Sequence, residues 1–291
     1  MKRMWSVLGA GLIVGMAVTL LLSCNPSIDG ELTLLVEKLD HESGFSHSPC
    51  WSSDATKVYY LSHWGNGEEY SSNYVIRSID LSDHSTRKVL DNNYDIGWMD
   101  VSHVSDICVT YSLDKLEEWL LYDLENSTLV DSINCSAQKQ KFSLESDQII
   151  YYSANDGIHK FNLADSSDEI FWTRGSGSDF APGPGDTLFA RGDTVFNINT
   201  GEAIPIGIAK VDMHCMNWNP AVAEELVLTT VRDLHIFNLE TEQLHRLDIR
   251  DVNVTHLEDA KFSPDGKRII FSCSVGRDLQ RDEIWMFEPE D

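Results

Sequence analysis

The chain has 291 residues, of which 47 are Asp or Glu and 22 are Lys or Arg, so its formal net charge is −25 at pH 7. A surface this acidic repels the phosphates of nucleic acids and anionic lipids, which excludes both as direct partners of the folded body. The length allows one large domain or two small ones.

Residues 1–23 predict an export signal that forms an N-terminal signal or anchor helix. Lys2 and Arg3 precede an apolar run without acids, which ends in small residues before Cys24. This order is typical of a secretory signal. An uncleaved membrane helix is the alternative, since about 20 apolar residues span a bilayer. Under either reading the rest of the chain lies outside the cytoplasm, tethered to a membrane.

The tetrapeptide Leu21-Leu22-Ser23-Cys24 resembles the bacterial lipoprotein signal. The resemblance implies that Cys24 is acylated and becomes the mature N-terminus, followed by a tether over residues 24–30. Several acyl chains on Cys24 would anchor the protein stably, because a single chain gives only marginal binding. Residue 25, directly after Cys24, is Asn rather than Asp, which resembles the outer-membrane sorting signal of Gram-negative lipoprotein families. This implies the periplasmic face of the outer membrane, or the cell surface, as the location.

Five cysteines follow Cys24. They are Cys50, Cys108, Cys135, Cys215 and Cys273. Their number is odd and no C-x-x-C occurs, so neither a disulfide framework nor a zinc site is implied. We expect them to act as small buried hydrophobes. The sequence leaves open whether Cys108 and Cys135 are bonded.

One hairpin-like pattern recurs along the chain. An aromatic residue or Ile is followed by Asp or Asn, an aliphatic residue, a polar turn and a second alternating run. This pattern predicts two strands joined by a turn. The copies are 79-IDLSDHSTRKV-89, 122-YDLENSTLVDS-132, 161-FNLADSSDEIF-171, 196-FNINTGEAIPI-206 and 237-FNLETEQLHRL-247.

A second landmark sets the phase of the repeat. It is an aromatic residue or Val, then a small residue, a turn and an apolar strand, as in 262-FSPDGKRIIF-271. The six phase residues are 38 to 50 residues apart. They are Trp51, Val101, Phe142, Phe180, Trp218 and Phe262.

Each unit therefore reads as four strands in about 40–45 residues, which is the period of a β-propeller blade. The sequence predicts an all-β fold in which residues 31–291 form a six-bladed β-propeller, with a monomeric body. The last unit ends after a third strand at 283-EIWMFE-288, whereas residues 31–39 form a strand without a blade. We expect 31–39 to be the outer strand of the last blade, because free strand edges are avoided.

The stretch Phe262-Ser263-Pro264-Asp265-Gly266 resembles the S-P-D-G repeat, called WD40-like or PD40, of the periplasmic TolB-like proteins and of prolyl-oligopeptidase relatives. The resemblance covers nearly all of residues 31–291 and implies the propeller fold, whereas it does not fix an activity. Residues 25–46 are too short for the α/β domain of TolB. No G-x-S-x-G is present, so the hydrolase of the peptidase relatives is not implied.

A binding site is expected where the loops enter the innermost strands, at one mouth of the axial channel. Polar residues that stand four positions before a phase residue are candidates, and they include His47, Gln138, His214 and Glu258. Their neighbours His256 and Asp259 are further candidates, with Asp100 and Asp179 nearby. Imidazole and carboxylate could bind a divalent cation there. The alternative is a polar lining of a water-filled mouth.

A second candidate surface is the long loop 61-LSHWGNGEEYSSNY-74, in which Trp64 and Tyr70 are typical interface anchors. Simple packing over the loop is the alternative for Trp64. We expect Trp119 to pack between sheets.

These features predict a non-catalytic cell-envelope lipoprotein that binds an envelope protein or glycan and needs no cofactor. The alternative is a polysaccharide lyase or hydrolase with a metal-assisted site in the channel, built from His47, His214, His256 and Glu258. A structural companion of a transporter or secretion system is a third possibility.

Overall fold

The structure is a computed structural model that describes residues 27–36, 46–63, 74–91, 96–112, 118–135, 137, 139–173, 180–208, 213–275 and 282–290. The expected N-terminal helix and Cys24 lie outside these residues. In the described part of the chain, no helix has the length and apolar character needed to cross a membrane.

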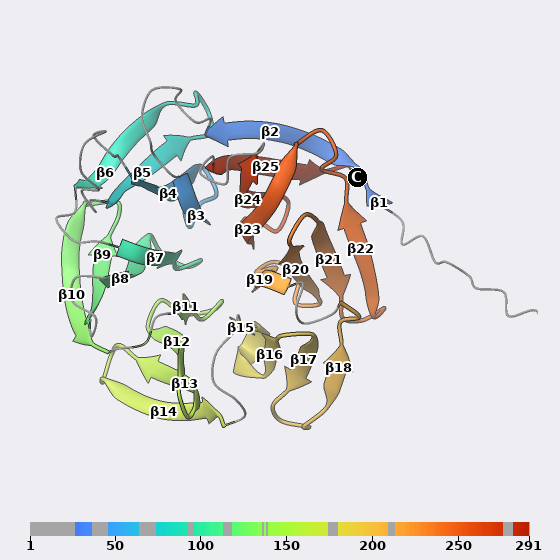
Figure 1. The fold of residues 1–291 in the computed structure, drawn as a ribbon. Helices are drawn as coiled ribbons and strands as arrows, with labels where there is room; N and C mark the ends of the chain where they lie inside the picture. Colours follow the sequence, from blue (N-terminus) through green and yellow to red (C-terminus); the bar gives the residue numbers. More distant parts are fainter. Residues whose placement is uncertain are drawn as a thin grey trace, which may run out of the picture.

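Six sheets, each with four antiparallel strands, stand around a central axis, so the predicted six-bladed propeller is confirmed (Figure 1). Blade 1 contains β3 (Ser46–Trp51), β4 (Lys57–His63), β5 (Tyr74–Asp80) and β6 (Thr86–Asp91). Blade 2 contains β7 (Ile96–Val101), β8 (Ile107–Ser112), β9 (Glu118–Asp123) and β10 (Thr128–Asn134). Blade 3 contains β11 (Gln140–Phe142), β12 (Ile149–Ala154), β13 (Gly157–Asn162) and β14 (Ser167–Trp172).

The second half of the ring repeats this order. Blade 4 contains β15 (Phe180–Pro182), a short 3-10 turn η1 (Pro184–Asp186), β16 (Leu188–Arg191), β17 (Thr194–Asn197) and β18 (Ala203–Pro205). Blade 5 contains β19 (Met213–Trp218), β20 (Glu225–Thr230), β21 (Leu234–Asn238) and β22 (Gln243–Leu247). Blade 6 contains β23 (Val254–Phe262), β24 (Ile269–Val275), β25 (Asp282–Pro289) and β2 (Gly30–Val36).

The recurring hairpin has one physical basis in blades 1 to 5. In each of these blades the third strand ends at Asp or Asn, and the Oδ1 atom of that residue accepts a backbone N–H from the turn at 2.9 to 3.0 Å. The five residues are Asp80, Asp123, Asn162, Asn197 and Asn238. The hydrogen bond from this side chain to its own turn replaces the strand-to-strand backbone bonds where the strand ends.

In the same turns, the residue four positions after the Asp or Asn has a left-handed backbone conformation. Its φ lies between 54° and 73° in all five turns. The residues are His84, Ser127, Ser166, Gly201 and Glu242. Only blade 4 uses the glycine that this conformation favours, so the other four turns carry a small local strain.

The phase residues mark the end of the innermost strand. β3, β7, β11, β19 and β23 end at the expected residues. In each of these blades the next residue donates its N–H across the turn to the start of the second strand, as Ser52 does to the Lys57 carbonyl (2.9 Å).

Blade 4 departs from the predicted phase by two residues. There Gly183 donates this bond to Leu188 at 2.8 Å, so the equivalent of a phase residue is Pro182 and not Phe180. The prediction was wrong because the pattern selects an aromatic residue, Phe180, whereas β15 ends at a proline, Pro182.

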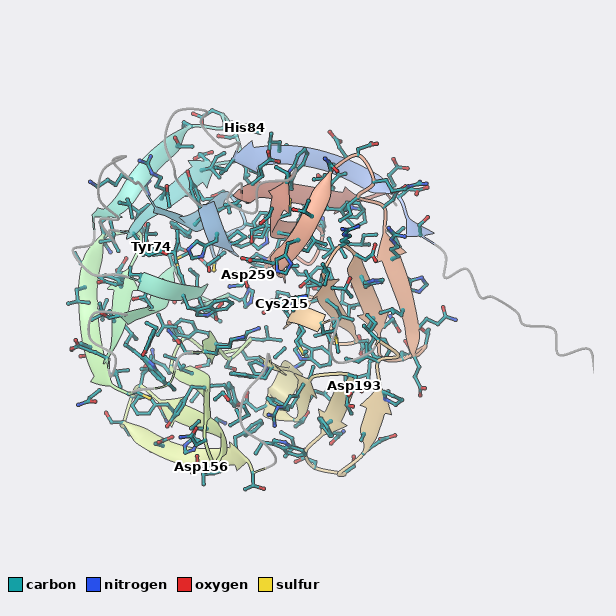
Figure 2. All side chains as sticks on the ribbon, viewed as in Figure 1. Tyr74, His84, Asp156, Asp193, Cys215 and Asp259 are labelled. Atoms are coloured by element: carbon teal, nitrogen blue, oxygen red, sulfur yellow. The ribbon has the colours of Figure 1, made fainter. Side chains whose placement is uncertain are left out.

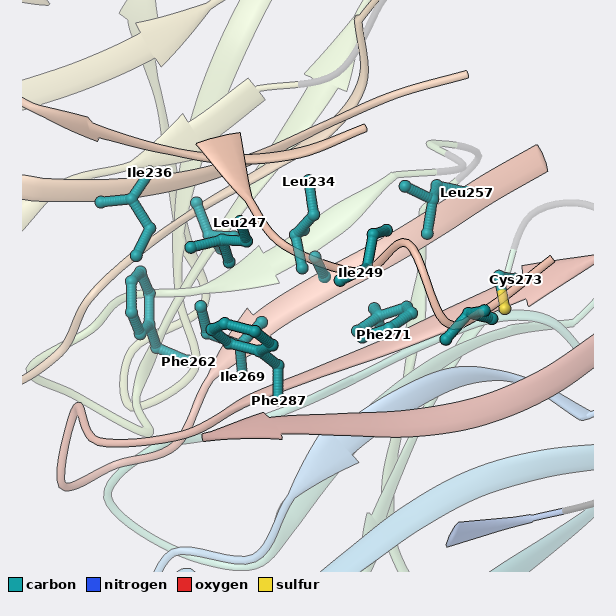
Figure 3. Packing of buried hydrophobic residues seen from close by; sticks show 13 residues of the cluster. Leu234, Ile236, Leu247, Ile249, Leu257, Phe262, Ile269, Phe271, Cys273 and Phe287 are labelled. Atoms are coloured by element: carbon teal, nitrogen blue, oxygen red, sulfur yellow. The ribbon is translucent and has the colours of Figure 1, made fainter. Parts of the chain in front are cut away.

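Each contact between neighbouring blades holds its own apolar cluster. Six such clusters lie at the six junctions of the ring. The largest lies between blades 5 and 6, where Phe262, Phe271 and Phe287 face Leu234 and Leu247 (Figure 3). The inner strands also touch their neighbours in succession, including β23 with β3, so the ring is closed.

Closure occurs in blade 6 as the sequence predicted. β2 pairs antiparallel with β25 from Gly30 opposite Pro289 to Val36 opposite Ile284. Leu35 is 8% exposed and packs in the cluster between blades 6 and 1. The N-terminal segment therefore completes the sheet that the C-terminal segment leaves with three strands. Residues 37–39 of the expected strand lie outside the described residues.

The segment assigned to the tether is partly folded into the propeller, which corrects the predicted boundary at residue 30. β1 (Ser27–Ile28) pairs in parallel with β22 and makes the blade 5 sheet five-stranded. Asp248 donates its N–H to the Ile28 carbonyl, and Glu290 donates to the Asp29 carbonyl, both at 3.0 Å. Two residues are too few for a strand pattern to be visible in the sequence.

The buried cysteines and Trp119 behave as expected. Cys50, Cys108, Cys215 and Cys273 are buried, Cys135 is half-buried, and all five are free thiols. Trp119 is fully buried in β9, and its indole Nε1 donates to the Ala137 carbonyl at 2.8 Å.

Removal of the closing strand should open the ring. A chain of residues 37–291 lacks β1 and β2, so it exposes the edge of β25 and loses the buried Leu35 side chain. We expect its free energy of unfolding in urea to fall by at least about 3 kcal/mol relative to residues 27–291. A chain of residues 30–291, which loses only β1, is the matched control and should lose much less. Equal stability of all three chains would contradict this account of closure.

Candidate functional site

The axial channel is lined by one residue from each inner strand. In blades with an aromatic residue or Val at the phase position, that side chain packs between blades, and the residue before it faces the axis because side chains alternate along a strand. The six residues at this position are Cys50, Asp100, Lys141, Ala181, Asn217 and Lys261. We call these six residues the axial layer.

Lys261 crosses from blade 6 over blade 1 to blade 2. Its Nζ lies 2.6 Å from Asp100 Oδ1 and 2.8 Å from Cys50 Sγ. The other Asp100 oxygen, Oδ2, accepts the backbone N–H of Phe142 in blade 3 at 2.9 Å. Blades 6 and 2 are not neighbours, so this bond passes through the channel.

Lys141 makes the equivalent crossing on the other side of the ring. It reaches from blade 3 past Ala181 of blade 4 and donates to the Met216 carbonyl (2.8 Å) and to Asn217 Oδ1 (3.1 Å) in blade 5. Asn217 Nδ2 in turn donates to the Ala260 carbonyl of blade 6 at 2.6 Å. Around the axis, the order lysine, small residue, Asp or Asn thus occurs twice, once over blades 6, 1 and 2 and once over blades 3, 4 and 5.

The charges of the axial layer are buried. Lys261, Lys141 and Asp100 are 4%, 5% and 7% exposed. Burial alone would lower the pKa of Lys261, but the charges around it, first among them the Asp100 carboxylate, together raise that pKa well above its usual value. Burial also raises the pKa of Cys50 to about 11, although Lys261 acts in the opposite direction. At neutral pH the layer therefore holds a lysine–aspartate ion pair beside a neutral thiol.

Two indoles bond the axial layer to the next blade. Trp51 Nε1 donates to the Lys261 carbonyl, and Trp218 Nε1 donates to the Ala181 carbonyl, both at 3.1 Å. Each indole thus holds the backbone of the channel-facing residue in the preceding blade. Lys261 is therefore held through its backbone carbonyl as well as through the ion pair of its side chain with Asp100.

The predicted mouth residues of blades 5 and 6 do come together. The rings of His214 and His256 are 4.6 Å apart in an edge-to-face arrangement, and His256 Nε2 lies 3.7 Å from Glu258 Oε1. Asp259 is buried and contributes to the electrostatic field at Lys261 and Cys50. Figure 2 places Asp259 and Cys215 near the centre of the ring, whereas His84, Asp156 and Asp193 lie at its periphery.

Backbone bulges set the direction of two of these side chains. His214 is the extra residue of a bulge between Met213 and Cys215, and Asp259 is the extra residue between Glu258 and Ala260. Bulges of this kind re-aim side chains and are common beside functional sites. Within the described residues His214 Nε2 is buried and has no hydrogen-bond partner.

The other predicted candidates divide into two groups. The His47 ring packs edge-on to Tyr74 with centroids 5.5 Å apart, and its Nδ1 lies 3.0 Å from Ser48 Oγ. Gln138, Trp64, Tyr70 and the lipidation candidate Cys24 lie outside the described residues. Among the side chains that the structure describes, no three His, Cys, Asp or Glu residues are arranged to hold a metal ion.

The axial layer as a unit was not predicted from the sequence. Asp100 was expected only as a neighbour of the mouth, and Lys141 and Lys261 were not among the predicted site residues. The available signal was a lysine directly before the phase residue in two inner strands, β11 and β23. A charged residue there is costly unless it is paired, so such a lysine indicates a buried partner.

A cleft of about 670 Å³ lies at the junction of blades 6 and 1, among the turns at the ends of the strands. Asp54, Lys57, Asp80, Asp265 and Arg268 contribute its charged groups. Arg268 donates to the Ala55 carbonyl at 2.8 Å and stacks over Trp51, so its guanidinium is already committed to the junction.

Comparisons with known proteins show the fold and no family. No family model and no curated protein sequence matches the chain. Many solved structures are similar, all of the following at low identity. Regucalcin from Agrobacterium tumefaciens, described as a calcium-binding protein, is 10% identical over 91% of this chain and 96% of its own, with a TM-score of 0.61.

Two further structures share the same fold at similar distance. A chain of a mitotic checkpoint complex is 13% identical over 99% of both chains, with a TM-score of 0.58. An oligogalacturonate lyase in complex with manganese is 12% identical over 92% of this chain and 95% of its own, with a TM-score of 0.51. The neighbours differ in function, so the likeness identifies the propeller alone.

Loss of the carboxylate from the axial layer should strongly destabilise the protein. In Asp100→Ala the Lys261 ammonium stays buried without its charged partner, which typically costs about 3–5 kcal/mol. We expect urea unfolding to show a loss of this size. The double variant Asp100→Ala with Lys261→Met removes both charges and should recover much of the loss. A double variant as unstable as the sum of the two single variants would contradict the pairing.

Proposed function

We propose that the protein is an exported lipoprotein whose propeller is a non-catalytic scaffold for proteins or glycans of the cell envelope. The observation that carries this proposal is the axial layer, which places the bonded side chains of Lys141 and Lys261 across the channel. A ligand therefore meets the mouth or the outer surface of the ring, and a rigid ring of blades is well suited to present such surfaces.

The outer strands of blades 2 and 3 supply surface for a protein partner. Leu129 and Val130 on β10 are 53% and 57% exposed, and Ile170 on β14 is 49% exposed. The two strands lie on neighbouring blades at the periphery (Figure 1). Apolar side chains exposed on adjacent elements are typical of surfaces that bind other macromolecules.

The membrane anchor rests on the sequence. Cys24 follows a signal-like segment and stands three residues before Ser27, where β1 begins at the outer edge of blade 5 (Figure 1). The acylated residue would lie within about 11 Å of that edge, since one residue spans at most about 3.6 Å. Asn25 supports the periplasmic face of the outer membrane or the cell surface as the location.

A relationship to the TolB-like PD40 repeat belongs to the same proposal. In the turn after β23, Asp265 Oδ1 accepts the Ser263 hydroxyl and the Lys267 N–H, and Gly266 has a φ of 72°. A Cβ at Gly266 would lie 2.5 Å from Asn219 Oδ1 of blade 5. The Ser, Asp and Gly of the repeat thus each have a local structural role, which supports the resemblance in fold and leaves the partner open.

The anchor is tested by Cys24→Ser in the expressing bacterium. We expect the wild-type protein to incorporate labelled palmitate and to sediment with membranes, and Cys24→Ser to lose the label and appear in the soluble fraction. Cys135→Ser, which changes the half-buried cysteine of the folded body, is the matched control and should behave as wild type.

The same cells test the scaffold. A photo-crosslinking residue at position 256 or 130 should capture one specific protein or glycan neighbour, whereas the same residue at exposed Glu242 should not. Wild-type protein that carries no acyl chain overturns the anchor, and absence of any position-specific product overturns the scaffold.

A metal-assisted polysaccharide lyase or hydrolase is the second candidate. The contact of His214 with His256, beside Glu258, favours it, because imidazole and carboxylate are common ligands of divalent cations. Two of the structural neighbours are described with calcium or manganese, which adds a reason to test for a cation. Further ligands would have to come from residues outside the described part of the chain, among which Gln138 is a candidate predicted from the sequence.

Metal analysis separates the two candidates. For the scaffold we expect the purified protein to hold no stoichiometric metal and to have a melting temperature that EDTA leaves unchanged. A single equivalent of metal that is lost in His214→Ala and retained in His235→Ala would favour the enzyme. His235 is the control because it is also a partly buried histidine of blade 5, on β21.

A further inference from the structure

The contact between Lys261 and Cys50 is short for a hydrogen bond to sulfur. Lys261 Nζ and Cys50 Sγ are 2.8 Å apart. Four other hydrogen-bond contacts of cysteine sulfurs in this protein measure 3.3 to 3.7 Å. The lysine is held at this distance by Asp100, which lies 2.6 Å from the same nitrogen.

From this geometry we propose that Cys50 and Lys261 form a modification site, at which dioxygen joins Sγ to Nζ through one oxygen atom. The product is a covalent sulfur–oxygen–nitrogen bridge. A single inserted oxygen keeps the nitrogen and sulfur about as far apart as they already are, so the bridge requires little movement of either strand. A direct sulfur–nitrogen bond would require a much closer approach.

The reaction balances with dioxygen as the only oxidant. The thiol, the ammonium group and one O₂ give the bridge S–O–NH, one water and one proton. Sulfur and nitrogen each lose two electrons, and O₂ gains four. One oxygen atom enters the bridge and the other leaves as water. The ammonium must lose a proton before nitrogen can bond to oxygen, and the Asp100 carboxylate is in place to accept it.

Burial selects this product over the usual oxidation products of cysteine. Cys50 is 1% exposed, so larger oxidants and other proteins' thiols are excluded from it. Oxidised sulfur condenses with the nucleophile that it meets, and here the lysine amine is held against it. The reaction should be slow, because a buried neutral thiol reacts less readily than an exposed thiolate.

The bridge would join two inner strands on either side of the junction between blades 6 and 1. Cys50 lies on β3 and Lys261 on β23, and they are 211 residues apart in the chain. Ring closure otherwise depends on the non-covalent pairing of β2 with β25. A bond between β3 and β23 would keep the inner ring closed even when β2 is displaced.

Mass spectrometry of the purified exported protein tests the proposal directly. Protein kept in oxygen-saturated buffer should yield a linked pair of peptides, one with Cys50 and one with Lys261. Their combined mass should be raised by one oxygen and lowered by two hydrogens. Dithiothreitol should separate the pair. The melting temperature of the oxidised protein should exceed that of the reduced protein by about 5 °C, the scale of cross-links that close long loops.

Three variants provide the controls. Lys261→Arg keeps the positive charge beside Asp100 and Cys50→Ser keeps a small polar group, and both should lose the linked peptide and the redox dependence of the melting temperature. Cys215→Ser changes another buried cysteine of an inner strand and should keep both. The proposal is overturned if oxidised wild-type protein contains Cys50 only as a thiol, or only as sulfinic or sulfonic acid, without a link to Lys261.

Discussion

Everything in this molecule depends on closing the ring, because each blade buries its two faces only against its neighbours. The six apolar clusters lie between blades, so an open ring would expose the clusters at its ends. Closure rests on the ladder of β2 with β25, which brings the N-terminal segment against the last strand. The pairing of β1 with β22 extends the same segment to blade 5, so residues 27–36 hold two blades from outside.

The axial layer solves a second problem that the closed ring creates. Six inner strands around an axis leave a space that is too narrow for large apolar side chains from every blade and that water would otherwise fill. Two lysines cross this space, each passing a small residue of the intervening blade, Ala181 or Cys50, to reach the blade beyond. Such buried charges stabilise a fold only when their partners are held in place. The partner of Lys261 is held by the Phe142 N–H, and the partner of Lys141 by its bond to the Ala260 carbonyl.

The fold was predictable because the blades repeat the same local sequence patterns. The Asp or Asn at the end of the third strand in blades 1 to 5 bonds its own turn, and the phase residue ends the inner strand. Both patterns involve residues that are close in the chain, so they can be recognised in one sequence. The pattern failed at Pro182, where the phase position has no aromatic residue, and at Ser27, where two paired residues have no periodicity.

The site was less predictable because it depends on distances between blades. His214 and His256 were both predicted as residues of the channel mouth, and the structure places their rings 4.6 Å apart on the inner strands of neighbouring blades. The bonds of Lys261 to Asp100 and of Lys141 to Asn217 span 161 and 76 residues. No local pattern encodes which blade a side chain reaches, since that depends on the number of blades and on the small residue in between.

The two lysine crossings share a geometry and differ in charge, and the difference follows the chain. Lys141 ends on neutral oxygens of Met216 and Asn217, in a sector where consecutive blades are joined by the chain and complete in themselves. Lys261 ends on a carboxylate, and it spans the sector in which blade 6 is completed only by non-covalent pairing with β2. A lysine bonded to a carboxylate makes a stronger contact than a lysine bonded to uncharged oxygens once the groups are buried and held. The stronger contact therefore spans the sector whose closure depends on β2. The mouth residues His256 and Asp259 stand on the same strand, β23, as Lys261.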